Sequence, residues 1–169
     1  MKTPVIIVRV MRFITVKISE QLLRLSEDER LLAEFPVSTS AHGIGNRDGS
    51  FQTPLGHHRI CEKIGDSMAE DEVFIGRQPQ GRLTDLQNKG VDLPEDIITA
   101  RILRLQGQEP GVNQGEGIDS YRRYIYIHGT ADEARISQPV SHGCVRMRNK
   151  DIIDLFNEVD VDTDVWIEA

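Results

Sequence analysis

Short runs in which apolar and polar residues alternate recur along this chain, and they limit its possible folds more than any other feature. From Phe13 to Ser19 the apolar side chains fall on alternate positions, which is the period of a half-buried strand. Two similar runs follow, separated by a charged turn, and they predict an antiparallel meander. These runs are Gln21 to Leu25 and Leu32 to Val37, with the turn at Ser26 to Arg30.

Further strands are expected later in the chain. Their ranges are 58 to 64, 73 to 75, 102 to 106, 123 to 128 and 164 to 168. A helix is predicted from Lys150 to Val159, because its apolar residues recur on one face and Asn149 can cap its start. The pattern therefore indicates a mainly β fold, with one or more short helices and sheet at both ends of the chain.

The length of the chain fits a single domain. With 169 residues it can bury a core, so residues 1–169 are expected to form one unit with its core from about 13 to 167. Between residues 76 and 99 the alternation is lost, and the prolines and glycines there predict an excursion from the sheet. A lid and a surface loop without a role are both open interpretations of this segment.

Charge and hydropathy exclude several kinds of partner. The 27 acidic and 20 basic side chains give a formal net charge of -7, which repels nucleic acid and anionic membrane surfaces. In the N-terminal run from Met1 to Arg12, the two arginines interrupt the apolar residues before they reach the length of a signal-peptide core. No run approaches the roughly 18 apolar residues of a membrane span. We therefore expect a cytoplasmic protein, or a periplasmic one if the true start lies upstream.

The chain has two cysteines, Cys61 and Cys144, which a reducing compartment would keep as thiols. The apolar neighbours of Cys61 favour a small buried hydrophobe. Cys144 lies in SHGCVRM, from Ser141 to Met147, downstream of a predicted strand that ends at His128. A cysteine is a useful nucleophile only as its thiolate, so it needs a nearby base or positive charge. The segment supplies both, which predicts that Cys144 is a catalytic nucleophile.

Three strings of residues carry a family resemblance. They are TPLG at Thr53 to Gly56, YIHGT at Tyr126 to Thr130 and SHGCVRM at Ser141 to Met147. In this order they resemble the L,D-transpeptidase catalytic domain, or YkuD family, from about Phe13 to Ile167. The resemblance implies a β-sandwich or barrel-like sheet and neither a cofactor nor a metal. It also implies a substrate, the peptidoglycan stem tetrapeptide, cut between its third residue, of L configuration, and its terminal D-alanine.

The resemblance further implies roles for individual residues. His128 takes the thiol proton and Cys144 attacks the peptide carbonyl to give a thioester, with the Gly129 carbonyl as the third member of the triad. Gly143 lets the backbone approach the substrate closely, and the amides around Gly143 and Cys144 are the expected oxyanion donors. His142 is expected to support the pocket.

Three other side chains complete the predicted site. Ser141 either hydrogen-bonds to His128 or to the loop, or it simply fits the turn. Arg146 either grips a substrate carboxylate with two parallel bonds or forms a salt bridge to an acidic neighbour. Tyr126 shares a strand face with His128 and is a candidate for substrate binding.

The acyl-enzyme has two possible fates. Water would release a trimmed tripeptide, which is an L,D-carboxypeptidase reaction suited to murein recycling. The amine of another stem would give a cross-link between two third residues, which is transpeptidation in cell wall biogenesis. The expected cytoplasmic location favours the carboxypeptidase. A silent muropeptide-binding module and a redox sensor at Cys144 both leave His128 less well explained. A zinc site built from histidines and cysteines is disfavoured by their spacing, since the sequence has neither a CxxC pair nor an HExxH helix.

Overall fold

The computed structural model describes residues 9–169, so Met1 to Val8 of the N-terminal run lie outside the described residues. Within this range the chain forms a ten-stranded mixed sheet, and the mainly β prediction is confirmed. The strands are β1 (Arg12–Lys17), β2 (Leu22–Glu27), β3 (Arg30–Pro36), β4 (Gly56–Ile64), β5 (Glu72–Ile75), β6 (Gln78–Arg82), β7 (Ile98–Gly107), β8 (Tyr126–Thr130), β9 (Val145–Met147) and β10 (Asp164–Glu168). The helices are α1 (Leu83–Asn88) and α2 (Asn149–Glu158), with short 3-10 turns at Ile18–Glu20 and Glu133–Arg135.

The sheet joins the two ends of the described chain. The expected meander is present, because β1 pairs antiparallel with β2, and β2 with β3. β10 lies parallel to β1, with Val165 beside Ile14, and antiparallel to β4. The order of the main path is β3-β2-β1-β10-β4-β7-β5-β6, while β8 pairs with β7 and with β9. The strands that carry the predicted site therefore branch from β7.

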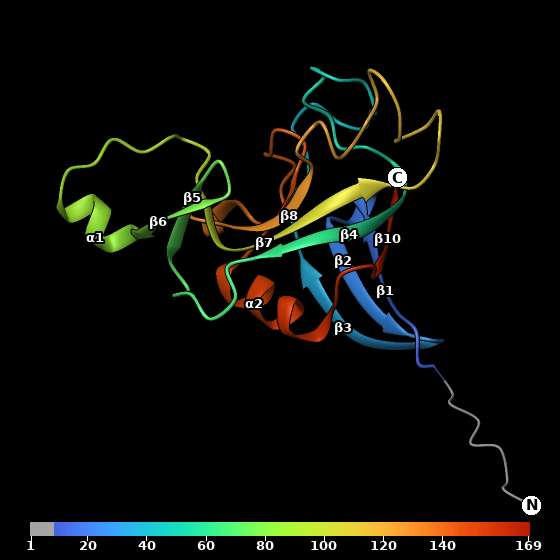
Figure 1. Cartoon of the computed structure of the whole chain (residues 1–169), viewed down its shortest axis with the longest axis horizontal. Coiled ribbons are helices and arrows are strands. Elements are labelled where there is room, and N and C mark those ends of the chain that lie inside the picture. Colours follow the sequence, from blue (N-terminus) through green and yellow to red (C-terminus); the bar gives the residue numbers. More distant parts are fainter. Residues whose placement is uncertain (1–8) are drawn as a thin grey trace, which may run out of the picture.

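The main core lies between the curved sheet and α2 (Figure 1). The helix buries Ile152, Leu155 and Phe156 and packs against β7 and β8. Full burial of an apolar side chain of this size contributes about 1.5–3 kcal/mol. Lys63 closes the end of the helix, since its Nζ lies 2.7 Å from the Phe156 carbonyl and 2.6 Å from that of Val159. This packing supports β7 and β8 on the core side of the sheet.

The predicted helix exists, but its predicted cap is wrong. Arg148 occupies the cap position without a side-chain bond, and Asn149 is the first helical residue. The Asn149 N–H donates to Glu133 Oε1 at 2.7 Å. The Asn149 side-chain oxygen instead accepts the Thr99 hydroxyl at 2.6 Å. A carboxylate from a neighbouring turn thus satisfies the helix start, and the asparagine ties the helix to β7.

Two strand predictions need correction. β8 begins at Tyr126 rather than Arg123, because Tyr124 has a φ of 55°, which interrupts extended backbone. β7 begins at Ile98, earlier than predicted. The excursion from residue 76 to 99 contains β6 and α1, which the sequence did not predict because Pro79 and Gly81 interrupt the alternation.

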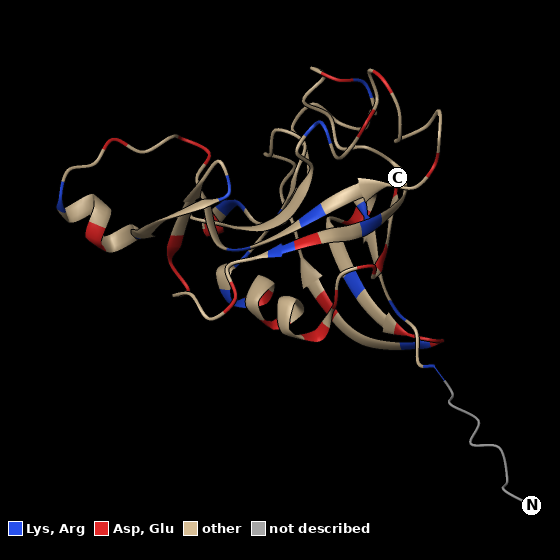
Figure 2. Cartoon of the chain, viewed as in Figure 1, with Lys and Arg blue, Asp and Glu red and all other residues tan. Residues whose placement is uncertain are grey.

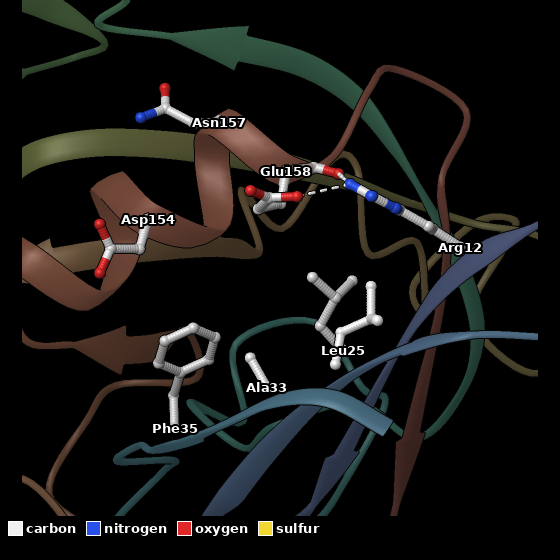
Figure 3. A pocket seen from close by; sticks show the side chains of 8 residues that line it. Arg12, Leu25, Ala33, Phe35, Asp154, Asn157 and Glu158 are labelled. Carbon is white, nitrogen blue, oxygen red and sulfur yellow. Dashed lines mark hydrogen bonds and ion pairs between the residues drawn. The ribbon is translucent and has the colours of Figure 1, made fainter. Parts of the chain in front are cut away.

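A groove of about 500 Å³ lies between α2 and the β1 to β3 meander (Figure 3). Its floor is apolar and includes Leu25, Ala33 and Phe35. At its rim Arg12 forms an ion pair with Glu158 at 2.6 Å. None of the predicted site residues lines this groove, so the predicted chemistry lies elsewhere.

Charged residues of both signs are interspersed along the strands (Figure 2). Many of them pair across neighbouring strands, as Arg24 does with Glu34 at 2.7 Å. Exposed pairs of this kind are screened by water and contribute little to stability. Between residues 9 and 169, no helix has the length and apolar character needed to cross a membrane.

Candidate active site

The pairing of β8 with β9 gathers the predicted site residues on one face of the sheet. The strands are parallel and His128 lies beside Arg146, so the same register places Tyr126 beside Cys144. Side chains alternate between the two faces of a strand, and Ile127 enters the main core. Cys144 packs instead against a second, smaller apolar cluster that includes Tyr126. The site therefore occupies the face that points away from the main core.

The backbone at the start of β8 holds the thiol of Cys144. The Tyr126 N–H points at Sγ from 3.3 Å, and the thiol donates to the Tyr124 carbonyl at 3.4 Å. Burial raises the pKa of Cys144 to about 11, although the Tyr126 N–H opposes this shift. The thiol is thus protonated at neutral pH, and it needs a base at the moment of attack.

His128 is suited to be that base. Its side chain is buried, and Nδ1 lies 2.6 Å from the Gly129 carbonyl. Since a carbonyl only accepts, Nδ1 carries the hydrogen and Nε2 keeps its lone pair. Burial lowers the pKa of His128, so the ring is neutral at neutral pH. The Gly129 carbonyl therefore sets both the tautomer and the orientation of the ring.

Close packing requires glycine at two positions of the site. A Cβ on Gly129 would lie 2.5 Å from Asn149 Oδ1. Gly143 has a φ of 124°, and a Cβ there would approach the Gln52 carbonyl to 3.2 Å. The Thr53 hydroxyl donates to the Gly143 carbonyl at 3.0 Å, so TPLG is tied to SHGCVRM.

Ser141 bonds to its own loop. Its hydroxyl accepts the Gly143 N–H at 3.2 Å and donates to the Cys144 carbonyl at 2.6 Å. The Gly143 N–H is thus engaged, whereas the Cys144 N–H donates to no acceptor of residues 9–169. Of the two amides, that of Cys144 is free to meet an oxyanion.

Asp96, which sequence alone did not single out, joins two predicted residues. Its Oδ2 accepts a hydrogen bond from His142 Nδ1 at 2.9 Å. Its Oδ1 lies 2.7 Å from Arg146 Nη2, an ion pair without good hydrogen-bond alignment. Burial acts to raise the pKa of Asp96, but the His142 bond and the Arg146 charge outweigh it and hold that pKa below its ordinary value. Buried Arg146 therefore already has a carboxylate partner, as in the salt-bridge interpretation.

Arginine and tyrosine side chains contact one another beside Tyr126. Arg77 Nη1 donates to the Tyr126 hydroxyl at 3.0 Å, and its guanidinium lies 5.4 Å from the centre of the Tyr124 ring. Arg104 lies 3.7 Å from the centre of the Tyr121 ring. These contacts join residues from separate strands and turns, so no local pattern in the sequence indicates them.

Cys61, His57 and His58 have other partners. Cys61 contacts the Arg104 carbonyl at 3.4 Å, and burial raises its pKa. His58 is buried and lies 2.8 Å from the Ser120 hydroxyl, while His57 pairs with Asp164. Both cysteines are free thiols. Across residues 9–169, no three His, Cys, Asp or Glu side chains are grouped to hold a metal ion.

Known proteins resemble this chain in sequence and in fold. The model of the YkuD family, the L,D-transpeptidase catalytic domain, matches residues 11–167. A curated relative, the putative L,D-transpeptidase YkuD of Bacillus subtilis (strain 168), is 46% identical over 46 residues, which are 27% of this chain and 28% of that protein.

Solved structures extend the likeness to the fold of the chain. The L,D-transpeptidase from Xylanimonas cellulosilytica DSM 15894 superposes with a TM-score of 0.59 at 16% identity, over 99% of this chain and 65% of that chain. L,D-transpeptidase 3 from Mycobacterium tuberculosis, in complex with a faropenem-derived adduct, gives 0.58 at 15% identity, over 95% and 61%. The chain thus spans less than two thirds of the length of these relatives. With the family model matched across nearly all the described residues, the chain belongs to the L,D-transpeptidase catalytic domain (YkuD) family.

Proposed function

We propose that this chain cleaves the peptidoglycan stem tetrapeptide between its third residue and its terminal D-alanine, through a thioester on Cys144. One observation carries the proposal. The β8 to β9 pairing sets the Cys144 thiol on the same face as His128, whose Nδ1 is held by the Gly129 carbonyl. The family match supports the class of substrate.

In the proposed first step, His128 Nε2 takes the thiol proton while Cys144 Sγ attacks the carbonyl carbon of the third residue. Both groups are neutral beforehand, because burial raises the pKa of the thiol and lowers that of the imidazole. The Cys144 N–H would donate to the oxyanion, and a donor of this kind contributes about 3 kcal/mol to transition-state stabilisation. The imidazolium then protonates the leaving amine, the peptide bond breaks, and D-alanine departs.

We assign the excursion from residue 76 to 99 to the substrate site rather than to a loop without a role. Both of its ends contact the site. Arg77 bonds to the Tyr126 hydroxyl, and Asp96 bonds to His142. A segment fixed at both ends in this way can cover a bound peptide and hold it against Cys144.

Water is the acceptor that we propose for the second step. It needs no second peptide site, and it would give a tripeptide, as an L,D-carboxypeptidase of cytoplasmic murein recycling does. The names of the relatives favour a second candidate, in which an amine of another stem attacks and forms a cross-link in the wall outside the inner membrane.

The test is to incubate the purified chain with a synthetic tetrapeptide stem, with and without an acceptor amine, and to follow products by mass spectrometry. Tripeptide and D-alanine in both tubes support the carboxypeptidase. A joined peptide in the tube with acceptor supports the transpeptidase. Cys61→Ala should keep the activity and Cys144→Ala should lose it. If the wild type turns over nothing but binds the peptide, the muropeptide-binding module replaces the enzyme.

A further inference from the structure

Arg77 stands at the tip of the hairpin formed by β5 and β6. Gly76 and Arg77 make its tight turn, with φ values of 55° and 66°. A positive φ is unfavourable for a residue with a side chain, so the arginine is held there by its surroundings. Its guanidinium donates to the Tyr126 hydroxyl and lies over the Tyr124 ring, so the hairpin carries a fixed cation to the site.

The positive charge of Arg77 is left without a carboxylate partner in residues 9–169, unlike that of its neighbours. Arg146 pairs with Asp96 at 2.7 Å, and Arg104 pairs with Glu62 at 3.0 Å. Glu62 is the carboxylate whose charge reaches Arg77, but it is already engaged by Arg104. A half-buried guanidinium with free donors, in a protein of net charge -7, is well suited to bind a carboxylate of a ligand.

Tyr126 sets the distance between this cation and the nucleophile. Its backbone N–H lies 3.3 Å from Cys144 Sγ, whereas its hydroxyl, at the other end of the side chain, lies 3.0 Å from Arg77. The carboxylate of a terminal D-alanine is only a few bonds from the carbonyl under attack, so it stays near Sγ. Arg77 lies one tyrosine side chain further away and fits a carboxylate at the end of a long side chain.

We propose that Arg77 is a specificity residue that binds a terminal carboxylate on the side chain of the third stem residue. This inference rests on the proposed function, in which the acyl carbon of that third residue bonds to Cys144. Its side chain leaves from the adjacent carbon and can run over the exposed Tyr124 ring to Arg77. A diaminopimelate side chain ends in a carboxylate and an ammonium, whereas a lysine side chain ends in an ammonium alone. The enzyme therefore selects diaminopimelate stems, because a lysine ammonium meets like charge at Arg77.

The experiment compares two synthetic tetrapeptides that differ only at the third residue, diaminopimelate or L-lysine. For the wild type, kcat/KM should be at least about tenfold higher with diaminopimelate, the size of effect expected from one charge-assisted contact. Arg77→Gln should lower kcat/KM for the diaminopimelate peptide about tenfold more than for the lysine peptide, mainly through KM. Arg82→Gln, on the same hairpin but paired with Asp71, should change neither.

Affinities measured calorimetrically with Cys144→Ala, alone and combined with Arg77→Gln, report on binding without turnover. The inference predicts a preference for the diaminopimelate peptide that disappears in the double variant. Equal affinities for the two peptides in the single variant would overturn it, as would an equal loss for both peptides in the double variant, which indicates a purely structural role. Retained preference with no wild-type turnover of either peptide would instead overturn the proposed function alone.

Discussion

Asp96 Oδ1 lies 2.7 Å from Arg146 Nη2, which joins the end of the 76 to 99 excursion to the strand that follows Cys144. The same carboxylate accepts a hydrogen bond from His142. The negative charge of Asp96 also reaches Cys144 and acts to raise the pKa of its thiol. Asp96 thus balances the charge of Arg146 and adds to the effect of burial, which keeps the Cys144 thiol neutral.

Replacing Asp96 by Asn should therefore make Cys144 more reactive. Loss of the negative charge lowers the pKa of Cys144, so alkylation by iodoacetamide at pH 8 should become about threefold to tenfold faster in a Cys61→Ala background. Removing one partner of a half-buried ion pair should also lower the free energy of unfolding by about 1–3 kcal/mol. Asp92→Asn, an exposed change on the same segment, is the control. An unchanged alkylation rate would contradict the charge effect.

The alkylation rate of Cys144 in wild-type surroundings should rise steadily with pH. Only the thiolate reacts, and burial raises the pKa of Cys144 to about 11, so the thiolate fraction grows until pH reaches that value. The rate is measured by mass spectrometry in the Cys61→Ala variant. A plateau already reached below pH 7 would mean a preformed thiolate and imidazolium pair, against the neutral pair inferred above.

Activity should persist to lower pH than a catalytic histidine of ordinary pKa would allow. Burial lowers the pKa of His128 below 6.5, and the ring accepts a proton only when it is neutral. The acid limb of kcat/KM should therefore have its midpoint below pH 6.5. His128→Asn should lower kcat by about a thousandfold, while His57→Gln should keep the wild-type pH profile. A midpoint above 6.5 would count against His128 as the base.

The buried His58 should make the fold sensitive to acid. Burial lowers its pKa from 6.5 to about 4, although the hydrogen bond to the Gly56 carbonyl acts to raise it. Between these two pH values the unfolded chain binds the proton and the native chain does not, so stability falls as pH falls. The loss attributable to His58 is about 3 kcal/mol and is complete below pH 4.

Urea unfolding at several pH values checks this with His58→Asn. The variant should be less stable at pH 7.5, because it loses one buried hydrogen bond, but its stability should fall less between pH 6.5 and 4. The stabilities of the wild type and of His58→Asn, plotted against pH, should therefore approach each other as pH falls. Parallel curves would show that His58 is not the group responsible.

Thr53 should matter for catalysis although it lies far from Cys144 in the sequence. Its hydroxyl donates to the Gly143 carbonyl and accepts the Ser40 N–H, each at 3.0 Å. Thr53→Val keeps the shape but removes both bonds, and we expect kcat to fall about tenfold as the Cys144 amide loses its alignment. Thr53→Ser restores the hydroxyl and should recover most of the activity. Equal rates for the two variants would exclude this positioning role.

Local periodicity predicted the elements that bury one continuous face. The alternation in β1, β2 and β3, and the helical spacing in α2, each record contact with a single core. The start of β8 was misplaced, because Tyr124 belongs to the same alternating run but adopts a positive φ to deliver its carbonyl to the Cys144 thiol. Periodicity records which face is buried, and it cannot reveal where a turn serves the site.

The contacts that complete the site come from elements distant in the chain. SHGCVRM predicted a nucleophile at Cys144, but the partner of Arg146 is Asp96 and that of the Tyr126 hydroxyl is Arg77, both within the 76 to 99 excursion. An ion pair of this kind has no spacing rule, since it depends on how the finished fold closes. The excursion was recognised from the loss of alternation, and its charged contacts were visible only in three dimensions.

The parallel pairing of β1 with β10 has a consequence during protein synthesis. While a ribosome is still adding residues, β1 can pair with β2 along one edge, but its other edge stays unpaired. The partner of that edge is β10, the last strand of the described chain. β4 also pairs with β10, so one of its edges stays unpaired until β10 has been made. Pairing between such distant segments is slow and leaves edges exposed that attract other chains. Truncation before Asp164 should thus yield an aggregating chain, even though every predicted catalytic residue would be present.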